Sequence, residues 1–272
     1  MNGSDALLGL TLLGYLAGAV VLGANVLLRR PSLLLVGRLL AGAGALVHTA
    51  AIGLRCAELK LAPFGTPAEA LSALAWMIVL AYLITEIRWR LSAAGPFALG
   101  LAFLLTISTW FAPAYHGTPA PDLLRSRAIS LHITATLAAI GVFALAFCCA
   151  ALYLVTHHIL KQKHGLVWLK RLPPLMTVEN AAFSLVAFGF PLLTLGILAG
   201  FARFFAGEPL PAGWWSDPHS LLAFVVWGVY GLYLLVRLVA NWPPVRTAYV
   251  LLVGLALCLL LFLAPSATHR FG

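Results

Sequence analysis

The stretch GWWSDPHSLLAFVVWGVYGLYLLVR, residues 213–237, decides the fold class of this chain. Asp217 followed by Pro218 is typical of a helix start, because an aspartate caps free backbone N–H groups and a proline at the first helical position has no N–H to leave unpaired. The residues that follow are almost all apolar as far as Arg237, about the 20 helical residues that cross ~30 Å of hydrocarbon. The stretch therefore predicts a membrane-spanning helix.

The rest of the chain has the same composition. Its 272 residues are 62% apolar and 9% charged, whereas soluble domains carry about 25% charged residues. Eight apolar stretches of spanning length are separated by short polar or Pro/Gly-marked breaks. The sequence therefore predicts an all-α, polytopic integral membrane protein in which residues 1–272 form a single membrane domain. The expected spans are 6–28, 34–54, 68–86, 93–112, 128–156, 177–204, 219–240 and 245–264.

The basic residues predict the orientation of these helices, since Lys and Arg concentrate in cytoplasmic connections. Eleven of the seventeen fall at alternate breaks, accompanied by two acidic residues, and the remaining breaks hold six basic and six acidic residues. We therefore expect both termini on the outer side and the formal charge of +9 on the inner side. This distribution favours contact with the lipid bilayer and its anionic head groups, and argues against a nucleic-acid partner. The eleven are Arg29, Arg30, Arg38, Arg88, Arg90, Lys161, Lys163, Lys170, Arg171, Arg237 and Arg246.

Motifs for nucleotide, thiol or metal-ion chemistry are missing from the sequence. The four cysteines form no C-x-x-C pair, which excludes the usual dithiol motif and the covalent haem attachment motif. There is no Walker loop, no G-x-G-x-x-G and no group of carboxylates at metal-ligand spacing.

Five of the eight histidines map to the outer half of the predicted bundle, and three of these could converge on one site. His48 and His132 lie near the outer ends of their helices, and His269 follows the last helix. Neutral imidazole is a common axial ligand of haem iron, and intramembrane ionisable residues are costly enough to suggest function. A single histidine in an apolar helix is nevertheless more often a structural residue, hydrogen-bonded to a neighbouring helix, so both interpretations stay open.

The tryptophans before the opening helix have two interpretations as well. Trp214 and Trp215 lie where interfacial tryptophans anchor a membrane helix. Together with Asp217 they also offer a flat aromatic platform with a polar rim, and a porphyrin stacks on such a surface. The N–H groups at the helix start are suited to an anionic propionate.

These residues resemble a known family. The stretch from Gly213 to Arg237 is similar to the tryptophan-rich WWD segment of the cytochrome c assembly, or haem-handling, superfamily that includes CcsA, CcmC and CcmF. In that family two external histidines flank the segment and ligate a haem iron at the outer membrane face. The resemblance implies haem b as cofactor, with His132 in SLHITATLAA and His269 in PSATHRFG as the axial metal ligands. The residues that fit the family's pattern after the tryptophans are Asp217, Pro218, Trp227, Tyr230, Tyr233 and Arg237.

Within the superfamily the chain looks most similar to the small CcsA-like branch with YpjD and HemX, and His48 in GRLLAGAGALVHTAAIGLR belongs to this resemblance. It departs from the pattern in having a short WWD segment, in having His219 and Ser220 where the family has lysine and glutamate, and in having Leu235 where CcsA proteins carry a histidine that helps bring haem from inside. Haem binding at the outer face is therefore the expectation, whereas the histidine that the family uses to bring haem from inside is replaced by Leu235.

The sequence thus predicts a haem-binding protein of the bacterial cytoplasmic (inner) membrane that holds or presents haem b through His132, His269, Trp214, Trp215, Asp217 and Trp227, with His48 as an auxiliary residue. An apocytochrome c or another membrane assembly protein would be its partner, and the chain has no residue set for stand-alone catalysis. The alternative is a HemX-like regulator or scaffold that acts through the inner basic segment 161–171. A transporter of another solute would need discontinuous helices, for which Pro191 is the one strong candidate break.

Overall fold

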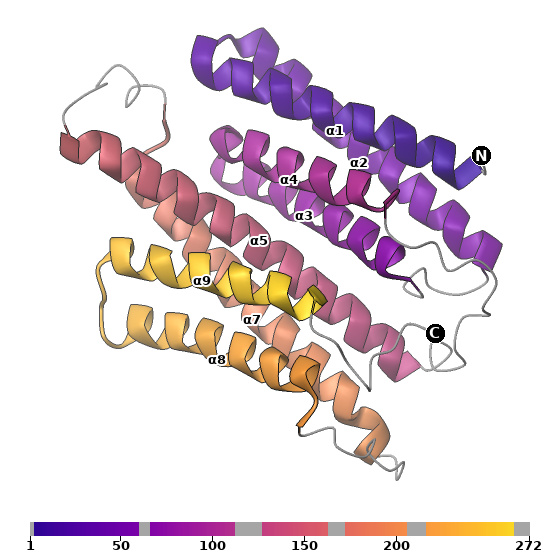
Figure 1. The fold of residues 1–272 in the computed structure, drawn as a ribbon. Coiled ribbons are helices and arrows are strands. Elements are labelled where there is room, and N and C mark those ends of the chain that lie inside the picture. Colours follow the sequence, from indigo (N-terminus) through magenta and orange to yellow (C-terminus); the bar gives the residue numbers. More distant parts are fainter. Residues whose placement is uncertain (1–2, 60–65, 112–126, 163–171, 206–215, 264–272) are drawn as a thin grey trace.

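The computed structural model describes residues 3–59, 66–111, 127–162, 172–205 and 216–263, and every regular element in these ranges is helical. Seven of the helices are long and apolar enough to cross a membrane. The predicted all-α class and multi-span architecture are therefore confirmed (Figure 1). The helices are α1 (Gly3–Leu28), α2 (Pro31–Leu59), α3 (Pro67–Trp89), α4 (Gly95–Ser108), α5 (Arg127–Gln162), α7 (Leu175–Phe205), α8 (Pro218–Leu238) and α9 (Pro244–Leu263), with a short 3-10 helix, η1 (Ser92–Ala94), before α4.

The fourth helix falls furthest short of its predicted span. The sequence predicts a span over 93–112, whereas α4 has 14 residues, about 21 Å at 1.5 Å per residue against a ~30 Å hydrocarbon layer. Pro96 places the helix start at Gly95. At the other end the hydroxyls of Ser108 and Thr109 donate to the carbonyls of Leu105 and Thr106, and such local bonds compete with helix continuation. A prediction from apolar composition alone contains no information on either end of α4.

The helices form two groups, which Figure 1 shows as neighbouring layers of the bundle. In the N-terminal half, α1 packs on α2 and α4, and α4 packs on α3. In the C-terminal half, α5 packs extensively on α7 and also on α9, which in turn packs on α8. The two halves meet mainly through α3 and α5. Helix α5 is therefore the central helix, and 72% of its most apolar window is buried.

Successive helices are antiparallel, so the start of α1 and the end of α9 lie at the same end of the bundle (Figure 1). The orientation expected from charge makes this the outer face, where α3, α5 and α8 also begin. At the opposite, inner face, α1, α3 and α8 are each followed closely by a residue in the left-handed conformation, Arg29, Arg90 and Asn241. A left-handed residue is a common device for ending a helix.

Candidate functional site at the outer end of the C-terminal half

His132 lies in the second turn of α5, at the predicted outer face. Its Nδ1 is 2.7 Å from the backbone carbonyl oxygen of Gly196 on α7. A carbonyl accepts only, so Nδ1 carries the proton and donates, and in the neutral ring Nε2 is then the unprotonated nitrogen. Metal-ligating histidines typically donate their other ring N–H to a carbonyl or carboxylate in this manner. The geometry of His132 therefore fits the role of an axial ligand.

Two glycines on α7 make this contact possible. A Cβ atom on Gly200 would lie 2.9 Å from Nδ1 of His132, and a Cβ on Gly196 would lie 2.5 Å from the hydroxyl oxygen of Thr136 on α5. Real Cβ atoms essentially never approach that closely. Small residues allow membrane helices to pack backbone against side chain. Gly196 and Gly200 therefore set the position of the imidazole from the facing helix.

Asp217 begins α8 as the sequence predicts, with Pro218 in the first turn. Its side chain accepts hydrogen bonds from the backbone N–H of Ser220 at 3.2 Å and from the Ser220 hydroxyl at 3.3 Å, and it is only 4% exposed. The carboxylate thus accepts from one of the free backbone N–H groups at the helix start. The predicted cap is confirmed.

His219, for which no role was expected, lies close to both Asp217 and His132. Its imidazole is hydrogen-bonded to the backbone of Leu261 near the outer end of α9, and it lies within electrostatic range of both Asp217 and His132. The structure thus brings His132, Asp217 and His219 together from α5 and α8, with α7 and α9 completing the surroundings. Two imidazoles and one carboxylate from different helices form the candidate site.

Trp227 lies on α8 farther from the outer face. Its indole Nε1 donates to the hydroxyl of Thr194 on α7 at 3.0 Å, and its ring centroid is 5.3 Å from that of Phe190. Thr194 is two residues from Gly196, so Trp227 holds α8 against the part of α7 that positions His132. This contact makes Trp227 a positioning residue in the described structure.

Tyr230 and Arg237, which fit the family's pattern together with Trp227, also connect α8 to its neighbouring helices. The Tyr230 ring stacks on Phe143 of α5, with centroids 3.5 Å apart and planes 9° from parallel. Arg237 forms an ion pair with Glu179 of α7. The pattern on α8 is therefore a line of contacts that fixes this helix to α5 and α7.

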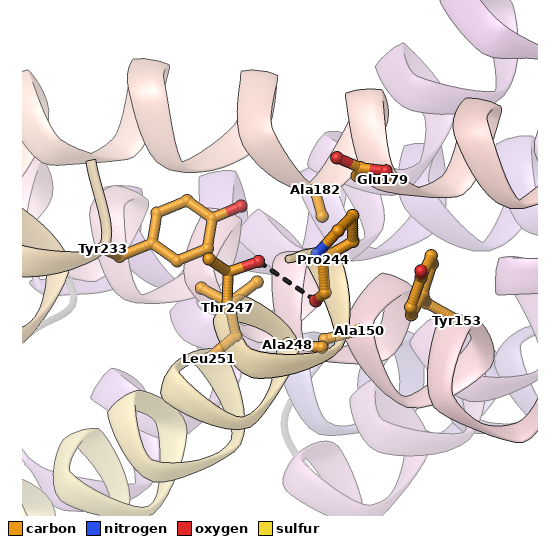
Figure 2. A pocket seen from close by; sticks show the side chains of 9 residues that line it. All are labelled: Ala150, Tyr153, Glu179, Ala182, Tyr233, Pro244, Thr247, Ala248 and Leu251. Carbon is orange, nitrogen blue, oxygen red and sulfur yellow. Dashed lines mark hydrogen bonds between the residues drawn. The ribbon is translucent and has the colours of Figure 1, made fainter. Parts of the chain in front are cut away.

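Figure 2 shows a small pocket at the inner end of this half. Tyr153, Tyr233 and Glu179 supply its polar side chains, and the Thr247 hydroxyl donates to the Pro244 carbonyl at 3.0 Å. With a volume of about 10 Å³ the pocket has room for no more than a single water molecule. It therefore completes the packing around the Arg237–Glu179 pair and offers no space for a larger ligand.

His48 has different surroundings, in the N-terminal half. Its side chain is fully buried, with Nδ1 2.9 Å from the Tyr15 hydroxyl on α1 and Nε2 2.9 Å from the Ser72 hydroxyl on α3. Both ring nitrogens thus take part in hydrogen bonds that join three helices. These contacts lie in the N-terminal half, whereas the contact between His132 and Gly196 lies in the C-terminal half.

The predicted site residues His269, Trp214 and Trp215 lie outside the described residues. The sequence interpretation missed two ion pairs at the inner face, Arg38–Glu86 and Arg237–Glu179. The available signal was an acidic residue close to the inner end of an otherwise apolar helix. Such a residue calls for a basic partner on a neighbouring helix.

Fold and site together define a multi-span membrane protein with an imidazole cluster at one end of its C-terminal half. The family described as Cytochrome C assembly protein matches residues 64–267, and the chain belongs to this family. The match includes α3 to α9 and with them His132, Asp217 and Trp227. Helices α1 and α2, which carry His48, precede it, and His269 lies two residues beyond its end.

Individual relatives agree with this assignment. The chain is similar to the cytochrome c biogenesis protein CcsA of Guillardia theta, at 27% identity over 246 residues, which cover 82% of this chain and 81% of that protein. It is also similar to protein HemX of Bacillus subtilis, at 30% identity over 172 residues, which cover 63% of this chain and 62% of HemX. A third relative, CcsA of Mesostigma viride, is 24% identical over 242 residues, or 77% of each chain. The resemblance to the CcsA-like and HemX branch is therefore confirmed.

Proposed function

We propose that this chain holds or presents b-type haem at the outer membrane face, at the outer end of α5, α7, α8 and α9. Membership of the cytochrome c assembly family supports the general role, which is haem handling during cytochrome c assembly. The observation that carries the specific proposal is the hydrogen bond from His132 Nδ1 to the Gly196 carbonyl. It gives His132 the tautomer and the fixed orientation of a metal-ligating histidine.

His132 supplies one axial ligand in this proposal and His269 the other. Trp214 and Trp215 form the aromatic platform for the porphyrin, next to Asp217 at the start of α8. These assignments of His269 and the tryptophans rest on the family resemblance. Asp217 accepts the Ser220 N–H, so its contribution is to fix the helix start beside the platform.

Haem, when bound, supplies the iron and the vinyl groups that an apocytochrome's cysteines attack during attachment. The residues of this chain hold and orient it. Gly196 and Gly200 keep the His132 imidazole in place, and Trp227 holds α8 against α7 through Thr194. The partner would be an apocytochrome c or another membrane assembly protein, and the location the bacterial cytoplasmic membrane.

A HemX-like regulator or scaffold is the second candidate function. The 30% identity to HemX of Bacillus subtilis favours it. So does Leu235, whose side chain is 57% exposed on α8 and stands where CcsA proteins carry a haem-transporting histidine. A transporter of another solute has less support, because α7 runs from Leu175 to Phe205 as one helix through Pro191.

Visible spectroscopy tests the proposal. The protein is purified in mild detergent, and oxidised and reduced spectra are recorded as isolated and after adding haemin. The same spectra are recorded for His132→Ala and His269→Ala. The matched control is His158→Ala, which removes an exposed histidine at the inner end of the same helix α5.

We expect a sharp reduced α-band of low-spin, bis-histidine haem in the wild type and in His158→Ala, and its loss in both ligand variants. Haem binding by either ligand variant with wild-type strength and spectrum would refute that ligand. If the wild type takes up no haem, the haem proposal is wrong and the regulatory function becomes the leading candidate.

A further inference from the structure

A second candidate site lies at the inner face of the N-terminal half, at the opposite end of the bundle from His132 and His219. A cavity of about 250 Å³ is lined by Arg38 of α2, by Leu83, Glu86 and Ile87 of α3, and by Arg90. This volume is many times the 10–15 Å³ that one water molecule needs by the same measure. The cavity opens to the surface, because Arg90 and Ile87 are exposed.

Glu86 is the buried polar side chain of this cavity. It is 5% exposed, and its Oε1 accepts from Nε and Nη2 of Arg38 at 2.8 and 2.5 Å. Its Oε2 is buried and has no hydrogen-bond partner within the described residues. The large majority of buried side-chain oxygens have a partner. An unpartnered carboxylate oxygen on the wall of a cavity therefore indicates a ligand that carries a hydrogen-bond donor.

Two neighbours of Glu86 have the same property. Among the described residues, the buried hydroxyls of Tyr82 and Thr85 also lack a hydrogen-bond partner. Both belong to the last turns of α3, and Tyr82 lies within electrostatic range of Glu86 and Arg38. Unsatisfied polar atoms are thus concentrated where α3 reaches the inner membrane surface.

The charges around the cavity indicate that the ligand also carries a negative charge. Arg38 uses two of its N–H groups on Glu86, and a guanidinium has five. Arg90 adds a second guanidinium, and Glu86 is the one carboxylate among the described residues that line the cavity. Two cations and one carboxylate leave a single positive charge, which a phosphate diester with one negative charge would balance. Arginine is well suited to phosphate because its planar N–H groups match phosphate geometry.

The apolar wall completes the ligand. Ile87 is 83% exposed and, with Leu83, borders the charged end of the cavity. A ligand with an anionic head and an apolar tail contacts both parts. At the inner surface of a membrane, that description fits a phospholipid.

We propose that this cavity binds the head group of an anionic phospholipid such as phosphatidylglycerol. The phosphate lies between the guanidinium groups of Arg38 and Arg90, a head-group hydroxyl donates to Oε2 of Glu86, and the acyl chains run along Leu83 and Ile87. The site is independent of the haem proposal. It anchors the inner end of α3 to one lipid.

Native mass spectrometry of the detergent-purified protein, titrated with phosphatidylglycerol, tests this site. Arg90→Gln is the main variant. Position 90 has a left-handed backbone conformation, and glutamine, like arginine, is an unbranched L-residue there, so the substitution leaves the backbone strain unchanged. Arg88→Gln is the matched control. It removes the same charge from the same helix end, where Arg88 lies over the Trp89 ring at 5.4 Å and does not line the cavity.

We expect Arg90→Gln to bind phosphatidylglycerol at least about fivefold more weakly than Arg88→Gln, because a charge-assisted contact to phosphate is lost. The wild type should also prefer phosphatidylglycerol to phosphatidylmethanol, which has the same phosphodiester charge but no head-group hydroxyl for Glu86. Equal affinities of the two variants would overturn the site and leave only general attraction between a basic surface and anionic lipid. Competition by inorganic phosphate as strong as that of the lipid would overturn the assignment to a lipid.

Discussion

Each half of this protein has a histidine whose ring is hydrogen-bonded to another helix, and the two differ in burial and in partners: His48 is fully buried and His132 is half-buried. His48 in the N-terminal half bonds through both ring nitrogens to hydroxyls on two other helices. In the C-terminal half, the Nδ1–H group of His132 donates to the backbone carbonyl of Gly196 on one other helix. The hydrogen-bond partners therefore distinguish the two imidazoles: hydroxyls hold both nitrogens of His48, whereas a backbone carbonyl fixes the tautomer of His132.

His48→Ala has the largest expected effect on stability. It removes the partner of the buried Tyr15 and Ser72 hydroxyls, and leaving buried polar groups unsatisfied costs about 1–3 kcal/mol. Thermal unfolding in mild detergent measures this loss. With a structural role for His48, the variant still shows the haem spectrum when loaded at low temperature, whereas loss of that spectrum in folded protein would show His48 to be part of the haem site.

Gly200→Leu examines the other histidine without removing it. Its Cβ would lie 2.9 Å from Nδ1 of His132, so the imidazole must shift, and disturbing the support of a metal ligand typically costs about 10–100-fold in affinity. Haemin titration should therefore show at least about tenfold weaker binding than the wild type. Gly228→Leu on α8 is the control, because nothing lies within 4 Å of its added Cβ. Equal affinities in the two variants would show that the α7 contact does not set the position of His132.

Two buried tyrosines allow a smaller test of the same comparison. Tyr15→Phe removes a hydrogen bond to His48 and should lower the free energy of unfolding by about 1 kcal/mol. Tyr230→Phe keeps the stacking on Phe143 and removes a hydroxyl that interacts with the Cys258 thiol, a weak acceptor. It should therefore be nearly neutral. A larger loss for Tyr230→Phe in thermal unfolding would mean that its hydroxyl has a role in the C-terminal half.

The smallest expected effects come from a matched pair of tryptophans. Trp76 donates to Thr49 in the N-terminal half at 2.9 Å, and Trp227 donates to Thr194 in the C-terminal half at 3.0 Å. Each Trp→Phe variant should lose about 0.6 kcal/mol, the average for a hydrogen bond between membrane helices. Only Trp227→Phe should also broaden or shift the reduced haem band, because Thr194 lies next to the support of His132. Identical haem spectra for the two variants would remove Trp227 from the site.

Most of the fold could be predicted from composition. The eight expected spans match eight helices in the described ranges, with bounds that agree within six residues. This success follows from the thickness of the membrane, which fixes helix length. The length of α4 was not predictable in this way, because its ends depend on Pro96 and on hydroxyl groups of the last turn. A hydropathy pattern does not contain that information.

The candidate site could be predicted only in part. Asp217 and Pro218 form the predicted cap because a cap is local in sequence. The partner of His132 was not predictable, since Gly196 lies 64 residues away. The same holds for Glu86, whose partner Arg38 lies 48 residues away on another helix.

The sequence by itself therefore determined that this is an all-helical membrane protein, where its helices lie, and which family it belongs to. These properties follow from local composition, from the cost of exposing polar groups to hydrocarbon, and from short motifs. Only the tertiary structure decided which nitrogens of His48 and His132 form hydrogen bonds, that His219 lies near His132, and that an unpartnered oxygen of Glu86 borders a cavity. Each of these features involves residues of different helices, and helix packing brings those residues together.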